Sequence, residues 1–119
     1  MGFTYAIMRL SNPSNREKGR DLNLLVNSGA IYSVVHEERL KELDIKPEGR
    51  QSFKMADGRI IEREFGIAIV EHEGKRAGTV VIFGEVDDTE VLGVHALEGL
   101  GLELDPVTKE LRPMTPLLV

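Results

Sequence analysis

The sequence predicts an all-β protein, and three observations lead to this prediction. Twelve glycines and five prolines interrupt the chain at short intervals, as turns do between strands. The apolar stretches between them are brief, so long amphipathic helices are not expected. Asp57-Gly58 lies between two β-prone segments and is a strong signal for a hairpin, because both turn positions tolerate positive φ.

Strands and turns alternate in the first third of the chain. The apolar-rich segment Phe3–Leu10 predicts a strand, and the charged segment Ser11–Gly19 predicts an exposed turn. The short apolar run Leu22–Val26 is consistent with a strand buried on both faces. Asn27–Gly29 then predicts a turn, and Ala30–Val35 returns to β character.

A first short helix is expected at His36–Leu43. Glu37 and Glu38 lie in its first turn, where they complement the helix dipole, and Leu40 shares a face with Leu43. We interpret His36 as a capping or surface residue rather than a metal ligand or a catalyst.

The middle of the chain predicts a hairpin followed by another strand. Its arms are Ser52–Ala56 and Arg59–Val70, and a second turn is expected near Glu73-Gly74. Thr79–Phe83 is β-branched and apolar, which favours a strand.

The last third predicts one short apolar segment, a helix and a hairpin. Val91–Gly93 is a short apolar run closed by glycine, and Val94–Leu100 reads as a helix with capping-box spacing between its His and Glu. Leu102–Leu104 and Glu110–Arg112 suit a last hairpin. The tail Pro113–Val119 is apolar for a chain end, so we expect it to pack on its own domain or on a partner.

Composition excludes several functional classes. The 119 residues make room for one domain, and the net charge of −5 argues against binding to nucleic acid or an anionic membrane. The chain has no cysteine, and its three histidines are scattered, so we expect no metal and no cofactor. We see neither a signal peptide nor an apolar run that could span a bilayer, and we therefore expect a cytoplasmic protein.

Three motifs carry a resemblance to a known family. Leu24–Ala30 (LLVNSGA) resembles the active-site strand and loop of the retropepsin-like aspartic proteases, which read Asp-Thr-Gly or Asp-Ser-Gly. Met55–Ile60 (MADGRI) resembles their flap hairpin. Val91–Gly93, leading into Val94–Glu98, resembles the apolar-apolar-Gly segment and the short helix that close their fold. The order of the motifs also fits, and the resemblance covers about Phe3–Arg112.

The resemblance implies a closed barrel with a flap hairpin and one or two short helices. Residues 1–119 would form a single retropepsin-like domain that supplies half of a homodimeric peptidase. Such enzymes pair two aspartates that share a proton, and a chain this short supplies only one loop. By resemblance, the catalytic loop is Asn27, Ser28 and Gly29. Peptide or protein substrate is expected to contact Ala30, Ile31, Met55, Ala56, Asp57 and Gly58.

Asn27 occupies the position of the catalytic aspartate. A carboxamide does not titrate near neutral pH and accepts no proton from water, so the chain as written is predicted to be inactive. Two explanations stay open: an engineered Asp-to-Asn replacement, and a natural pseudoprotease that serves as a peptide-binding or dimerisation module. A further hypothesis is that Asn27, which is followed by Ser28, deamidates slowly and regenerates aspartate.

Simpler interpretations accompany these motifs. Asn27–Gly29 and Asp57-Gly58 also suit plain turns, and Val91–Gly93 suits core packing. We interpret the acidic segment 84–90 as a solvated loop, because it lacks the glycine and the terminal glutamate of an EF-hand loop. Phe3–Leu10 and Pro113–Val119 are the candidate dimer contacts, since the termini commonly form the subunit interface in retropepsin-like dimers.

Overall fold

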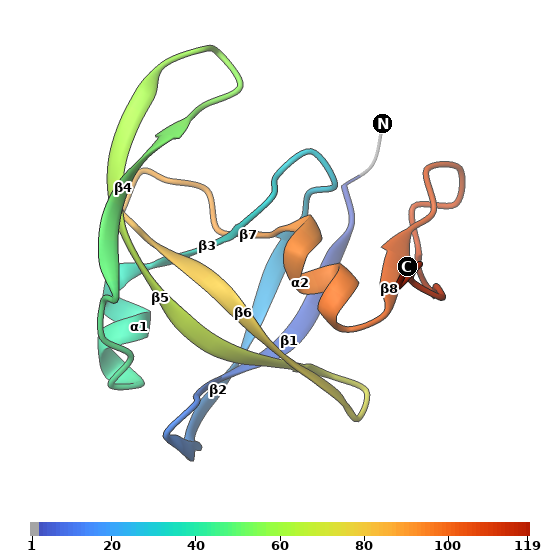
Figure 1. The fold of residues 1–119 in the computed structure, drawn as a ribbon, viewed down its shortest axis with the longest axis horizontal. Helices are drawn as coiled ribbons and strands as arrows, with labels where there is room; N and C mark the ends of the chain where they lie inside the picture. The colour runs from blue at the N-terminus through green and yellow to red at the C-terminus, as the bar shows by residue number, and fades with distance from the viewer. Residues whose placement is uncertain (1–2) are drawn as a thin grey trace.

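A computed structural model describes residues 3–119 of the chain (Figure 1). Its elements, in order, are β1 (Tyr5–Asn12), β2 (Asn15–Val26), β3 (Ser33–His36), α1 (Glu37–Glu42), β4 (Gly49–Lys54), β5 (Ile60–His72), β6 (Lys75–Gly84), β7 (Val91–Leu92), α2 (Val94–Gly99), β8 (Leu102–Leu104) and β9 (Leu111–Pro113). The first seven strands form one sheet in the order β1-β2-β7-β3-β6-β5-β4. An additional pairing of β1 with β5 closes six of these strands into a ring, and β4 pairs with β5 outside it. The predicted all-β class with short helices is therefore confirmed.

The core lies inside this ring, where the two helices and alternate side chains of the strands meet. In β1, Ala6, Met8 and Leu10 are buried while Tyr5 and Ile7 face outward, as the two-residue period of a strand requires. Apolar residues from the ring and both helices form one buried cluster: Ala6, Met8, Leu10, Leu22, Leu24, Val26, Val35, Leu40, Leu43, Ile45, Ala68, Val70, Val81, Phe83, Leu92, Ala96, Leu97, Leu100 and Leu102.

The exposed turn predicted at Ser11–Gly19 is wrong for most of its length. Strands β1 and β2 continue through it as a long antiparallel hairpin, and only Pro13 and Ser14 form the turn. The start of β2 is charged and mostly exposed, so no apolar alternation marks it as a strand. The buried Asn12 Nδ2 donates to the backbone oxygens of Leu43 and Asp44 at 2.9 Å, which fixes the hairpin to the end of α1.

The segment predicted as the strand Ala30–Val35 is a loop up to Tyr32, and β3 begins at Ser33. β3 runs parallel to β6, with Val35 opposite Phe83. Helix α1 follows at once, close to its predicted limits.

The histidines at the helix starts do not cap. No side-chain hydrogen bond caps α1, and the ring Nε2 of His36 instead lies 2.7 Å from the Asp88 carbonyl oxygen. The N-cap of α2 is Gly93, which has no side chain, so the capping box predicted between His95 and Glu98 is absent from this helix.

The hairpin predicted around Asp57-Gly58 is confirmed as β4 and β5, with Lys54 opposite Ile60. Only Gly58 has a positive φ, of 90°, so the turn is not of the type with two positive φ values. The Gly58 N–H donates to the Met55 carbonyl at 2.9 Å, which is the pattern of a three-residue loop ending in a left-handed glycine.

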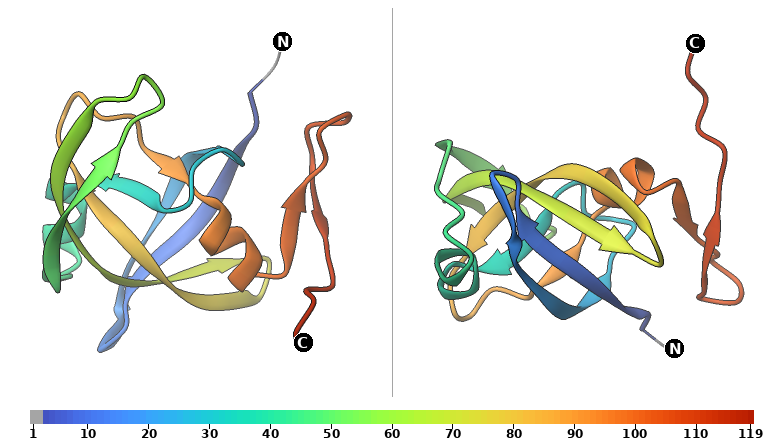
Figure 2. Two further views of the ribbon diagram at one scale, coloured as in Figure 1. Left: turned by 45° about the horizontal axis from the view of Figure 1, so that its top comes forward. Right: turned by 90° about the horizontal axis from the view of Figure 1, so that it is seen from below.

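The C-terminal hairpin is also confirmed, since β8 and β9 form a separate two-stranded sheet. Beyond it the chain leads away from the main sheet (Figure 2), and Leu117, Leu118 and Val119 are fully or almost fully exposed. Within residues 3–119 no helix is long and apolar enough to cross a membrane.

Candidate functional site

Asn27 directly follows β2, at the point where two parallel strands end together. β2 and β7 pair in parallel, with Val26 opposite Leu92, so Asn27 and Gly93 emerge side by side from the sheet. The Asn27 N–H donates to the Leu92 carbonyl at 3.0 Å and extends this pairing by one bond. The position of the loop of residues 27–32 therefore depends on β2 and β7, two segments that are far apart in the sequence.

The beginning of this loop is a compact turn organised by Asn27. Its side-chain Oδ1 accepts the Gly29 N–H at 2.9 Å, and its backbone oxygen accepts the Ala30 N–H at 3.1 Å. This is the Asx turn that short polar side chains favour. Asn27, Ser28 and Gly29 are exposed, and none of the hydrogen bonds among residues 3–119 uses the Ser28 hydroxyl.

The second half of the loop is fixed to the start of α2. The first N–H groups of a helix have no partner inside the helix and need acceptors elsewhere. Here the Val94 N–H donates to the Ala30 oxygen at 2.8 Å, and the His95 N–H donates to the Ile31 oxygen at 2.9 Å. The loop oxygens thus supply the acceptors that the first N–H groups of α2 need, and the same hydrogen bonds fix the position of the loop.

Gly93 permits this close approach. A Cβ at Gly93 would lie 2.6 Å from the Tyr32 carbonyl carbon and 2.7 Å from the Ile31 oxygen, both backbone atoms. The Gly93 N–H also donates to the Oγ of Ser33 at 3.0 Å, and Ser33 is buried. The predicted Val91–Gly93 segment is thus both a core strand and the seat of the loop.

The tip of the β4–β5 hairpin projects from the same end of the molecule as the 27–32 loop (Figures 1 and 2). The predicted substrate contacts Met55, Ala56, Asp57 and Gly58 are all exposed there. The Asp57 carboxylate accepts from the backbone N–H of Arg59 at 3.0 Å and from its Nε at 2.8 Å. These bonds, the backbone one first, lower the pKa of Asp57, so the turn stays ion-paired in mild acid.

Tyr32 connects the loop to the hairpin. Its ring packs edge-on against Phe53 of β4, with the centroids 6.1 Å apart, and against His95 of α2 at 6.2 Å. Its neighbour Ile31 is 66% exposed at the surface of the loop. The Tyr32 ring is therefore the contact between the loop, β4 and α2, and Ile31 adds an exposed aliphatic side chain to the loop.

An ion pair between β5 and the segment that precedes β7 was not predicted from the sequence. Arg63 of β5 binds both carboxylate oxygens of Asp88, at 2.8 and 3.0 Å, and both side chains are largely buried. Asp88 also accepts the Glu85 N–H at 2.7 Å, and Glu90 accepts the His36 N–H at 2.9 Å. The segment 84–90, interpreted above as a solvated loop, is therefore held by specific bonds, and that interpretation is wrong for Asp88 and Glu90.

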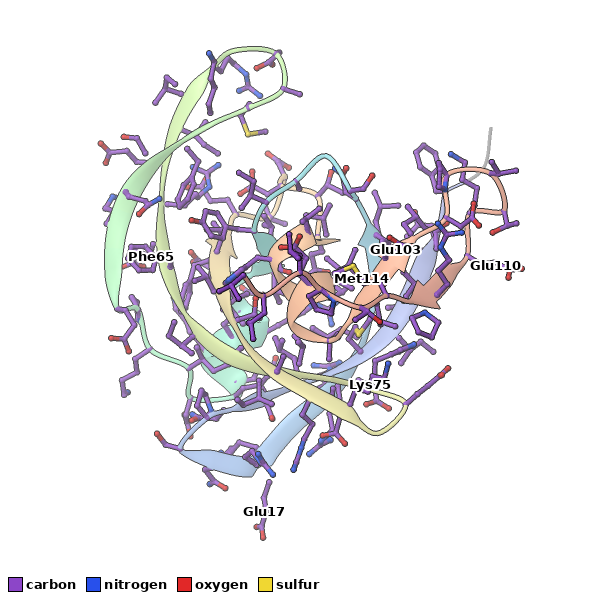
Figure 3. All side chains as sticks on the ribbon, turned by 45° about the vertical axis from the view of Figure 1, so that its right-hand side comes forward. Glu17, Phe65, Lys75, Glu103, Glu110 and Met114 are labelled. Atoms are coloured by element: carbon purple, nitrogen blue, oxygen red, sulfur yellow. The ribbon has the colours of Figure 1, made fainter. Side chains whose placement is uncertain are left out.

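A groove lies elsewhere on the described part of the chain. It has a volume of about 1130 Å³ and runs between β1, the β5–β6 turn and the β8–β9 hairpin. Figure 3 shows Lys75 and Glu110, two of the residues that border it. The exposed apolar side chains of Phe3, Tyr5 and Ile7 line its β1 side. Among residues 3–119, no cluster of three or more acidic, His or Cys side chains is arranged to hold a metal ion.

Comparison with known proteins identifies the fold. No protein-family model matches the sequence, and no curated protein matches it. Among solved structures, the chain is similar to the EIAV protease in complex with the inhibitor HBY-793, with a TM-score of 0.69 over 87% of this chain and 93% of that chain. The chain has the retropepsin-like fold. Sequence identity to that protease is 18%, so the likeness is one of architecture.

Within the retropepsin-like fold, the three predicted motifs lie toward one end of the molecule. The 27–32 loop rests on Gly93 and α2, and the β4–β5 hairpin projects beside it. Of the predicted site residues, Asn27, Ser28, Gly29, Ala30 and Ile31 lie on the loop, while residues 55–58 lie at the hairpin tip. The functional roles of these residues remain predictions.

Proposed function

We propose that this chain is the scaffold of an aspartic endopeptidase of retropepsin type, which acts as a homodimer and is inactive in the present form. The observation that carries the proposal is the way the 27–32 loop is held within a retropepsin-like fold. The Asn27 N–H donates to the Leu92 oxygen, and the backbone oxygens of Ala30 and Ile31 accept the first N–H groups of α2. A generic turn needs no such support, whereas a catalytic residue must be held in place by its surroundings.

The chemistry explains why a second copy is needed. Aspartic proteolysis pairs two carboxylates that share one proton, so that one activates water while the other donates a proton. One chain supplies a single loop, and an identical chain across a two-fold axis would supply the other. Residues 1–119 would then form one domain that is half of the enzyme. The Ser28 hydroxyl is available to bind across this interface.

Asn27 accounts for the inactivity. Its Oδ1 accepts the Gly29 N–H, as an aspartate oxygen at the same place would, so the loop keeps its geometry. The remaining nitrogen donates hydrogen bonds but accepts no proton from water. In a symmetric dimer both carboxylates are missing.

The substrate we propose is an extended peptide between the two loops and the two hairpins, held partly by β-type backbone hydrogen bonds. Met55–Gly58 would cover it as a flap, while Ala30 and Ile31 would contact it from below. The exposed Ile31 and the Tyr32–Phe53 pair favour apolar side chains next to the cleaved bond.

The proposed dimer contacts are Phe3–Leu10 and Pro113–Val119. Tyr5 and Ile7 are 57% and 61% exposed, and the tail residues make no core contact in the single chain. Apolar surface of this kind is typical of an interaction site. A cytoplasmic location also stays a prediction.

The test is a pair of peptide-library digests across a pH series, one with this chain and one with Asn27→Asp. The proposal predicts pepstatin-sensitive cleavage at acidic pH by the Asp form alone. A folded, dimeric Asn27→Asp protein that cleaves no peptide would refute it.

Asn27 itself favours a second candidate, a natural pseudoprotease that binds peptides or dimerises without cleaving. This candidate predicts that Asn27→Asp cleaves no peptide of the library, while the parent chain binds some of the same peptides. Binding measured on immobilised parent protein, beside the digests, separates the two candidates.

A further inference from the structure

The turn at Asn27 combines the groups that an intramolecular amide reaction needs. We propose that Asn27 is a self-modification site, at which the chain converts its own carboxamide into the carboxylate of an aspartate. The consequence for catalysis rests on the proposed function, but the conversion itself does not. Three observations support the proposal: the Asx turn, the unbonded Ser28 N–H, and the exposure of Asn27, Ser28 and Gly29.

The nucleophile of this reaction is the backbone nitrogen of Ser28. Succinimide formation begins when the backbone nitrogen of the following residue loses its proton and attacks the side-chain carbonyl carbon. Among the hydrogen bonds of residues 3–119, none uses the Ser28 N–H, although the Asn27, Gly29 and Ala30 N–H groups on either side are all bonded. The one free amide nitrogen of the turn is therefore the one that must react.

The side-chain carbonyl of Asn27, which is attacked, is polarised by a hydrogen bond. Its oxygen, Asn27 Oδ1, accepts the Gly29 N–H at 2.9 Å. A donor aimed at a carbonyl oxygen polarises the bond and stabilises the negative charge that develops in the tetrahedral intermediate. The same hydrogen bond folds the carboxamide back toward the backbone of the two residues that follow it.

The reaction needs only water from outside. The Ser28 nitrogen forms a bond to Asn27 Cγ, the Cγ–Nδ2 bond breaks, and ammonia leaves with the proton that Ser28 gave up. Water then opens the succinimide ring. Opening between Cγ and the Ser28 nitrogen gives aspartate at position 27, and opening on the other side gives isoaspartate, whose backbone is longer. No oxidant, metal or partner is required.

The chain carries its own controls, because it has four asparagines. Asn12 precedes Pro13, which has no N–H to attack with, and its Nδ2 is bonded to two buried carbonyls. Asn23 is exposed like Asn27, but it lies within β2, where the next residue faces Ala6 across the hairpin. The Val26 N–H donates to the Thr4 oxygen in the same hairpin, so the two-residue alternation makes Leu24 a hydrogen-bonded position as well.

The first experiment incubates the parent protein at mildly alkaline pH in heavy-oxygen water and follows each asparagine by peptide mass spectrometry. We expect aspartate and isoaspartate at position 27, both carrying the heavy oxygen, to form at least about tenfold faster than at Asn23, which corresponds to a barrier difference of about 1.4 kcal/mol. The rate rises with pH because the attacking nitrogen must be deprotonated. Equal rates at Asn27 and Asn23, or product without label, would overturn the proposal.

Two further arms test the role assigned to the turn. Ser28→Thr keeps the N–H and the hydroxyl but crowds the attacking nitrogen with a β-branched side chain, so conversion is expected to slow. In urea the turn is lost, and the preference for Asn27 over Asn23 is expected to shrink. A preference unchanged in urea would show that local sequence, not the fold, selects the site, and would refute the role of the turn.

Activity gives an independent readout. If each half of the dimer converts separately, dimers with two aspartates accumulate as the square of the converted fraction. The parent protein is aged in mild base and then assayed for cleavage in acid. Its rate of cleavage is expected to rise with the square of the converted fraction. A contaminating protease would instead add a rate that does not depend on conversion. If Asn27 is converted but no peptide is cleaved, and Asn27→Asp also cleaves no peptide, the proposed function is refuted while the self-modification is supported.

Discussion

Replacing Gly93 by alanine tests how closely the 27–32 loop packs against Gly93. Gly93 has φ −91° and ψ 173°, an extended conformation that alanine adopts without strain, so the substitution acts only through the added methyl group. That group would meet the Tyr32 carbonyl carbon at 2.6 Å and the Tyr32 and Ile31 oxygens at 2.7 Å. All three are backbone atoms, so no side chain can rotate away, and the loop must shift.

The cost has two parts. Overpacking of a well-packed position destabilises by about 1–3 kcal/mol. A shifted loop also weakens the bonds from Gly93, Val94 and His95 to Ser33, Ala30 and Ile31, each worth about 1 kcal/mol. We therefore expect a loss of about 2–4 kcal/mol, a large share of the roughly 5–15 kcal/mol that stabilises a domain.

Gly78→Ala is the matched control. Gly78 lies in β6, where the nearest contact of an added Cβ is the end of the Ile69 side chain at 4.0 Å. Alanine there removes chain entropy from the unfolded state and is expected to stabilise by about 0.5–1 kcal/mol. The two substitutions thus have opposite signs.

Urea unfolding of both variants and the parent, at one protein concentration, measures the difference. With a slope of about 1–3 kcal/mol per molar urea, Gly93→Ala lowers the midpoint by roughly 1 M or more, while Gly78→Ala raises it slightly. In the Asn27→Asp background, Gly93→Ala is also expected to abolish cleavage. Parent-like stability and cleavage in Gly93→Ala would refute the close approach of the loop.

Three other changes test separate contacts. Ser33→Ala removes the buried acceptor of the Gly93 N–H, and urea unfolding is expected to show a loss of about 1–3 kcal/mol; unchanged stability would contradict that bond. Asp88→Asn breaks the pair with Arg63, whose side-chain hydrogen bond lowers the pKa of Asp88 below 3.8. The pair therefore contributes its full free energy of stabilisation above pH 3.8, and this contribution is lost as the pH falls through the lowered pKa. The difference in unfolding free energy between parent and variant is expected to be constant near neutrality and to disappear only in strong acid. A difference that disappears between pH 5 and 7 would contradict this assignment. Deleting Pro113–Val119 removes exposed apolar surface and is expected to weaken self-association in sedimentation experiments, and an unchanged dimer would count against the tail as a contact.

Features with a local cause were predictable from the sequence. The β4–β5 hairpin depends on Gly58, which takes the one positive φ of the turn, and α1 depends on adjacent acidic and apolar residues. The loop at Asn27–Gly29 was found because turn residues follow a buried strand. In each case the decisive residues are close together in the chain.

Features that join distant segments were not predictable. The pair between Arg63 and Asp88 spans 25 positions, and nothing near Asp88 in the sequence distinguishes it from a solvated acid. The start of β2 is charged and exposed, so its pairing with β1 leaves no apolar pattern. The closure of the ring by β1 and β5 likewise depends on contacts between residues far apart, such as Leu10 and Val70.

The parallel pairing of β2 with β7 has a consequence for the order in which the protein folds. Loops between distant segments close slowly because their entropy is lost before the contacts form. The 27–32 loop lacks the Leu92 oxygen that accepts the Asn27 N–H, and the Gly93 backbone against which Ile31 and Tyr32 pack, until most of the chain has been synthesised. A nascent chain that ends before Val91 therefore holds the hairpins without a formed site. In an active relative built this way, the reactive loop would be assembled among the last parts of the molecule.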